Sequence, residues 1–203
     1  RLALGHTGGN IFLTGFVTVY GENQIAIDEM SKAFDADGRV MPVSLTRSSQ
    51  LHALFYDGTE AIHEPGVDMG IREGKSVKKL FLQPNAQANP AVLEVIKTAD
   101  VVCIGPGSFY TSILANFLPD GITQAVKTAK VPVIYVANLM TEGLGMNQRT
   151  LSAYVNELSG TLNVYIDRVI ANTEFPAEPM LKRYATEERY PIVPDYSLNN
   201  ARI

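Results

Sequence analysis

The sequence contains one cysteine, Cys103, in 203 residues. A single cysteine excludes an internal disulfide framework and fits a reducing compartment. No signal peptide is evident, and no apolar run reaches the length of a membrane-spanning helix. These absences predict a cytoplasmic protein without membrane contact. Cys103 lies within an apolar run, so we expect it to be a small core residue.

The sequence also lacks an excess of positive charge. Seventeen Lys and Arg stand against 21 Asp and Glu, giving a net charge of −4. No basic patch stands out, which argues against a nucleic-acid partner. No internal repeat or low-complexity tract is present. The residues are 46% hydrophobic and 19% charged, as is usual for a globular domain with a substantial core.

Several well-known motifs are missing. There is no G-x-G-x-x-G dinucleotide fingerprint, and Ser108 does not lie in the G-x-S-x-G of a nucleophile elbow. Gly70–Ser76 resembles a P-loop but is one residue short and lies in a polar connection. His52, His63 and Glu64 do not have a metal-ligand spacing, so no metal site is predicted. Most of four loop carboxylates are expected to be solvated: Asp57, Glu60, Glu64 and Asp68.

The hydrophobic pattern predicts helices alternating with short apolar strands. Helices are expected at 11–20, where a strand is the alternative, and at 24–34, 90–98, 111–117, 123–129, 151–158 and 179–184. Strands are expected at 40–45, 51–56, 77–82, 101–104, 131–137, 167–171 and 190–194. This order indicates a Rossmann-like α/β fold, with a mainly parallel sheet covered by helices on both faces. Residues of about 45–82 are expected to form a small β-rich insertion. We expect a single domain over 1–203, truncated at both ends.

The most informative segment is Val101–Ser112, in which an apolar run breaks at Gly105-Pro106-Gly107-Ser108. Two hydroxyl residues, Thr111 and Ser112, then open an amphipathic stretch. This is the pattern of a buried strand, a glycine turn and a helix N-terminus, which together offer unpaired backbone amides to an anion. The segment therefore predicts a phosphate site. The alternative is a tight turn whose hydroxyl residues only cap the helix.

A second loop, Asn138–Gly143, follows the next strand of the predicted sheet. The carboxyl ends of neighbouring parallel strands form one cleft, so Asn138, Met140 and Thr141 are expected at the same site. A third glycine-rich turn, Gly5–Asn10, precedes a helix and would add Gly9 and Asn10. His6 in that turn is either a general acid or base or a structural hydrogen-bonding residue.

At this point the residues resemble a known family. The run Gly105–Leu114, with Asn116 and the Pro119–Ile122 turn, closely resembles the signature of the gluconeogenesis factor family, also called YvcK. A related family is CofD, the phospholactate transferases of deazaflavin coenzyme synthesis. Weaker matches are spread along the chain: Gly5-His6, Gly9-Asn10, Gly38-Arg39-Val40, Pro42-Val43, Asp57-Gly58, Ala99-Asp100, Tyr135-Val136, Asn138, Met140-Thr141 and Asp195.

The resemblance implies a Rossmann-like fold with a nucleotide site. YvcK-like members are linked to carbon metabolism, cell shape and the binding of UDP-sugars, whereas CofD-like members transfer a phospholactyl group from a guanosine diphosphate donor. Two departures stand out. The family's glycine-rich strand and turn before this segment is not seen, and its Met-Thr-Gln-Pro-Gly-Glu-Thr run reads Met140-Thr141-Glu142-Gly143-Leu144-Gly145-Met146 here. Position 115, usually proline, is Ala115.

Three functions follow as hypotheses. The first is a regulatory protein that binds a nucleotide sugar, with Gly105, Gly107 and Ser108 on the phosphates and Asn138 and Thr141 on the sugar or base. The second is a CofD-like transferase, which would need Mg²⁺ or a cationic group that neither loop supplies. The third is a family member that binds a protein partner and no nucleotide. The chain is also a candidate homo-oligomer.

Overall fold

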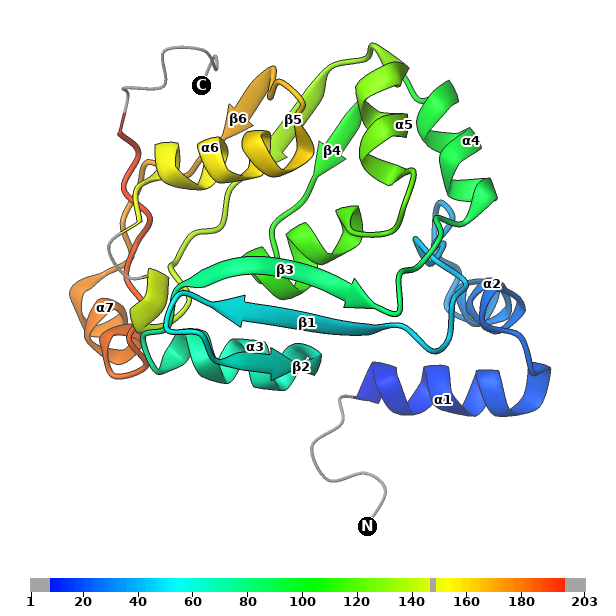
Figure 1. The fold of residues 1–203 in the computed structure, drawn as a ribbon, viewed down its shortest axis with the longest axis horizontal. Helices are drawn as coiled ribbons and strands as arrows, with labels where there is room; N and C mark the ends of the chain where they lie inside the picture. The colour runs from blue at the N-terminus through cyan, green and yellow to red at the C-terminus, as the bar shows by residue number, and fades with distance from the viewer. Residues whose placement is uncertain (1–7, 147–148, 196–203) are drawn as a thin grey trace. The chain divides into compact units, whose positions relative to one another are not determined.

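The computed structural model describes residues 8–146 and 149–195 and divides the chain into two compact units, Arg1–Val43 and Ser44–Ile203 (Figure 1). The described helices include none that is both long and apolar enough to cross a membrane.

The first unit is a pair of helices, α1 (Gly8–Tyr20) and α2 (Asn23–Ala33), as the hydrophobic pattern predicts. The ring of Phe12 in α1 meets that of Phe34 edge-on, with centroids 5.7 Å apart. Because α1 begins at Gly8, the segment Gly8–Asn10 is helical and not part of the expected turn. Gly5 and His6 of that turn lie outside the described residues.

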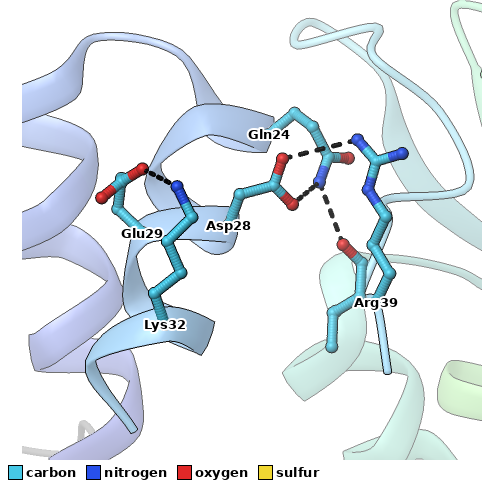
Figure 2. Close-up of polar contacts among 6 residues, drawn as sticks. Gln24, Asp28, Glu29, Lys32 and Arg39 are labelled. Carbon is cyan, nitrogen blue, oxygen red and sulfur yellow. Dashed lines mark hydrogen bonds and ion pairs between the residues drawn. The ribbon is translucent and has the colours of Figure 1, made fainter. Parts of the chain in front are cut away.

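Polar contacts hold the segment after α2 against that helix (Figure 2). The Gln24 side-chain amide donates to Asp28 at 2.7 Å and to the Val40 carbonyl at 3.0 Å. Arg39 reaches the other Asp28 oxygen at 3.4 Å. The hydrogen bond from Gln24 is the main cause that lowers the pKa of Asp28. A separate ion pair joins Lys32 to Glu29, which lie three residues apart on α2.

The second unit begins with an antiparallel sheet in the order β2-β1-β3, formed by β1 (Gln50–Phe55), β2 (Glu60–Ile62) and β3 (Val77–Gln83). This confirms the β-rich segment predicted for residues of about 45–82. Between β2 and β3 lies α3 (His63–Arg72), which sequence reasoning took for a polar loop. Gly70 lets α3 approach the sheet, because a Cβ there would lie 2.4 Å from the Phe55 ring.

The rest of the unit is an α/β arrangement around a parallel sheet in the order β4-β5-β6, formed by β4 (Val102–Ile104), β5 (Val133–Val136) and β6 (Arg168–Ile170). The helices α4 (Pro90–Thr98), α5 (Ile122–Ala129) and α6 (Leu151–Leu162) lie around it, and α7 (Glu178–Ala185) follows β6 (Figure 1). The predicted α/β class with a parallel sheet is confirmed. The predicted cap of α4 is also present, since the Asn89 side chain accepts from the Ala91 amide.

One hydrophobic core joins the antiparallel and parallel sheets of this unit. Phe55 and Ile71 belong to the same buried cluster as Tyr135, Tyr154 and Leu158. The β-rich segment and the α/β part therefore share a core, and loops from both parts meet at its border.

Several sequence predictions are wrong in detail. Residues 40–45 form no strand, and Ser44 makes only an isolated bridge to Ala88. Residues 190–194 likewise pair only through a bridge between Pro191 and Met140, since prolines cannot donate to a ladder. Cys103 is exposed and not a core residue, because β4 lies at the edge of the parallel sheet.

Candidate functional site

The two predicted loops lie side by side at the carboxyl ends of adjacent parallel strands. Ile104 at the end of β4 pairs with Tyr135 near the end of β5. Directly beyond, the Asn138 side chain bonds Gly107 in both directions: its Oδ1 accepts from the amide at 3.1 Å, and its Nδ2 donates to the carbonyl at 2.7 Å. The Gly105–Ser108 and Asn138–Gly143 loops are thus locked together.

The helix expected after the first loop begins as a wide turn, not as a regular α-helix. Residues Phe109–Ile113 form a π-helical turn, followed by a 3₁₀ turn at Leu114–Phe117. The Ser108 carbonyl accepts from both Ser112 and Ile113. Gly107 fits closely over this turn, since a Cβ would lie 3.1 Å from the Ser112 Cβ. Single π turns of this kind recur at functional sites.

The Glu142 side chain occupies the donors at the start of this turn. Its Oε2 accepts from the Phe109 amide at 2.9 Å. Burial raises the pKa of Glu142, although hydrogen bonds from Phe109 and Ser108 act in the opposite direction. Asp68 also raises this pKa, and Arg189 lowers it. A backbone amide at the start of the turn that is predicted to bind an anion is therefore already bonded to a carboxylate of the chain itself.

Asp68 joins the site from α3. It accepts a hydrogen bond from the Thr111 hydroxyl at 3.0 Å. Asp68 is one of the four loop carboxylates that are mostly expected to be solvated, and it is the exception: it is half-buried, whereas Asp57, Glu60 and Glu64 are exposed. The difference arises because α3 was not recognised as a helix packed beside the phosphate-loop candidate.

A cavity of about 390 Å³ opens beside these groups. Ser108, Glu142 and Asp68 line it together with two arginines, Arg72 at the end of α3 and Arg189 after α7. Its further lining residues are Ile71, Gly143, Thr186, Glu187 and Glu188.

These arginines supply the positive charge that neither loop contains. Both come from segments distant in sequence, and no motif marks them. The cavity offers cations for phosphate groups and carboxylates for hydroxyl groups.

The other residues predicted for the site have different surroundings. Thr141 is buried, and it is tied to Tyr190 by its amide at 2.7 Å and by its hydroxyl, which accepts at 3.0 Å. Met140 pairs with Pro191. These contacts hold the second loop to the segment after α7, and a ligand contact by either residue stays a prediction.

Five further candidates are open to solvent. Gly105 and Pro106 are exposed in the Gly105–Ser108 loop, and Ser112 is exposed in the turn that follows it. Gly9 and Asn10 are exposed in α1 of the first unit. The roles predicted for them in ligand binding stay predictions.

A polar cluster fixes the wide turn from its buried side. The Tyr110 hydroxyl donates to Glu157 at 2.6 Å and accepts from Arg149 at 2.9 Å, and Arg149 also pairs with Glu157. Burial is the main cause that raises the pKa of Tyr110. Glu157 lies on α6, so this cluster anchors the loop after β4 to a helix of the core.

The chain is similar to known proteins over most of its length. Residues 2–203 match the family "2-phospho-L-lactate transferase CofD". The chain is 34% identical over 193 residues to the gluconeogenesis factor of Halalkalibacterium halodurans, covering 94% of this chain and 59% of that protein. It is 32% identical over 190 residues to the gluconeogenesis factor of Bacillus subtilis, covering 93% and 59%.

A solved structure shows the same fold. A member of the UPF0052 family from Bacillus halodurans superposes with a TM-score of 0.84 at 34% identity, covering 94% of this chain and 61% of that one. The chain thus spans about three-fifths of the length of these relatives. The resemblance found in the sequence is confirmed: the chain belongs to the CofD family and, within it, is similar to the gluconeogenesis factors.

Proposed function

We propose that this chain binds a nucleoside diphosphate ligand, foremost a nucleotide sugar, in the cavity beside Ser108 and the two arginines. The observation that supports this most is the position of the cavity. It lies at the carboxyl ends of β4 and β5, where α/β proteins bind their ligands. The arginines suit a diphosphate, and the carboxylate of Asp68 suits the hydroxyls of a sugar or ribose.

In this account the protein is a cytoplasmic regulator of carbon metabolism and cell shape, as the resemblance to the gluconeogenesis factors implies. Ligand binding is then a signal and not the first step of a reaction. The loops would hold the phosphates, and the segment after α7, which supplies Arg189 and contacts Thr141, would respond to occupancy.

The second candidate is a transferase of the CofD type that moves a phospholactyl group. The match to the CofD family over residues 2–203 favours it. Such a reaction would use Mg²⁺ to offset charge on the diphosphate. In the described part of the chain no three metal-binding side chains cluster. Mg²⁺ is often held by one or two carboxylates plus ligand phosphates, so a larger cluster of carboxylates is not required.

Thermal shift measurements on the intact protein distinguish these functions. UDP-N-acetylglucosamine, GDP and NADP are each added with and without Mg²⁺. Stabilisation by the UDP-sugar that does not depend on Mg²⁺ supports the regulator. Turnover of a phospholactyl donor, measured in an activity assay, supports the transferase. No thermal shift with any nucleotide supports a partner-binding protein.

A further inference from the structure

Three groups near the phosphate-loop candidate are not explained by the proposed function alone. One is Glu142, whose carboxylate bonds the Phe109 amide. The others are the buried hydroxyls of Tyr135 and Tyr154, neither of which has a hydrogen-bond acceptor. The Asn138 backbone amide faces the Tyr135 hydroxyl as a donor and lowers its pKa. Tyr135 and Tyr154 are 0% and 1% exposed, so water does not replace the missing partner at the surface. Buried unpaired hydroxyls destabilise a fold and call for an explanation.

The two tyrosines lie on elements that adjoin the two loops of the site. Tyr135 is on β5, directly before the loop that contains Glu142. Tyr154 is on α6, and its ring meets that of Phe109 edge-on with centroids 5.0 Å apart. Burial is the main cause that raises the pKa of both hydroxyls, and it brings that of Tyr135 to about 12. The negative charge of Glu142 raises both pKa values further. Glu142 thus bonds the loop amide of Phe109, and its charge also affects the two buried tyrosine hydroxyls.

We propose that Glu142 is a displaceable internal occupant of the phosphate loop, which leaves the Phe109 amide and turns to the hydroxyls of Tyr135 and Tyr154 when a ligand phosphate arrives. This inference rests on the proposed function for its ligand. Two anions cannot share the Phe109 amide and the Ser108 hydroxyl, because like charges at contact distance repel. The exchange keeps the carboxylate hydrogen-bonded and gives the buried hydroxyls the acceptor that they lack.

The charged groups around Glu142 set the direction of its pH dependence. Asp68 of α3 adds negative charge, as do Glu187 and Glu188 of the cavity wall, whereas Arg189 and Arg72 of that wall add positive charge. Tyr135 and Tyr154 stay neutral through the neutral range, since burial raises their pKa. Protonation of Glu142 removes the competing anion, so a diphosphate ligand should bind more tightly below the raised pKa of Glu142 than above it. A diphosphate diester has no ionisation of its own in this range.

Calorimetric titration with UDP-N-acetylglucosamine tests the exchange on the intact protein. Glu142→Gln should tighten binding about tenfold at pH 7.5 and flatten the pH dependence, because the competing charge is gone. In the wild-type background, Tyr135→Phe and Tyr154→Phe should each weaken binding of the UDP-sugar. In the Glu142→Gln background, neither substitution should weaken it. Glu94→Gln, which removes an exposed carboxylate of α4, is the matched control and should change nothing.

A second measurement needs no ligand. The amide proton shift of Phe109, followed by NMR, should titrate with Glu142 in the free protein and stop titrating in Glu142→Gln. Weaker or unchanged binding by Glu142→Gln overturns the exchange while leaving the proposed function intact. Binding of no nucleotide by any variant, with the Phe109 amide still titrating, rejects the proposed function and overturns the displacement with it. A Phe109 amide that does not titrate overturns the occupancy itself.

Discussion

The side chain of Asn138 and the backbone of Gly107 form a two-way hydrogen-bonded pair that closes the ends of β4 and β5 into one unit. An asparagine side chain has the same donor and acceptor as a peptide group. It therefore continues the hydrogen bonding between the two chain segments beyond the ends of the paired strands. The phosphate-loop candidate therefore owes its shape to the neighbouring loop as much as to its own glycines.

Removing this pair should destabilise the fold. Asn138→Ala leaves the half-buried Gly107 amide and carbonyl without partners, and we expect a loss of about 1–3 kcal/mol in the free energy of unfolding. Urea denaturation measures this loss. Asn156→Ala on the exposed face of α6 is the matched control and should stay within about 0.5 kcal/mol of the wild type. Equal stability of the two variants would show that the pair does not hold the loops together.

The altered run after Thr141 should be intolerant of side chains at its first glycine. Gly143 has a φ of +78°, and a Cβ would lie 2.8 Å from the Arg72 Cα. Gly143→Ala should therefore cost about 1–3 kcal/mol of stability. Gly160→Ala in α6, where no atom lies within 4 Å of the added Cβ, should instead be neutral or stabilising by about 0.5–1 kcal/mol. Thermal unfolding of both variants gives the comparison, and a harmless Gly143→Ala would contradict the close packing of this loop on α3.

Stability should depend on pH through Glu142. Burial raises the pKa of this carboxyl above its ordinary value of 4.5, so the folded protein keeps a proton that the unfolded chain has lost. The contribution of Glu142 to the free energy of unfolding is therefore most favourable at low pH and decreases as pH rises above about 4.5 through the raised pKa. Glu142→Gln should remove this slope, whereas Glu94→Gln should keep it. Urea denaturation at pH 4 to 8 measures it, and an unchanged slope in Glu142→Gln would place the titrating group elsewhere.

The arginine after α7 should contribute to ligand affinity. Arg189 lines the cavity, so Arg189→Gln should weaken binding of a nucleoside diphosphate about tenfold, as expected for a lost charge-assisted hydrogen bond. Arg183→Gln, on the exposed side of α7, is the control and should bind as the wild type does. Calorimetry with UDP-N-acetylglucosamine gives both values. A loss of the same size in both variants would indicate a general effect of charge and not a contact.

Sequence reasoning found the fold class, both parallel-strand loops and their pairing, because glycine turns after short apolar runs are local signals. It missed α3, since His63–Arg72 contains a proline and two glycines and reads as a loop. With α3 it missed the places of Asp68 and Arg72 at the cavity.

The contact of Glu142 with the Phe109 amide likewise could not be predicted from the local sequence pattern. The run Met140–Met146 showed a departure from the family, but a departure does not say where a side chain points. Only the packing of the second loop on α3, made possible by Gly143, brings the Glu142 carboxylate to the Phe109 amide. Arg189 reaches the cavity through the contact of Tyr190 with Thr141, which joins segments 49 residues apart.

The most direct test of the account is a calorimetric titration of the intact protein with UDP-N-acetylglucosamine, repeated on Ser108→Ala. The account predicts saturable binding at a single site without Mg²⁺, weakened about tenfold in the variant because a phosphate donor is lost. Binding of equal strength in both proteins, or none with this sugar nucleotide and none with GDP, would contradict a diphosphate site at the Gly105–Ser108 loop.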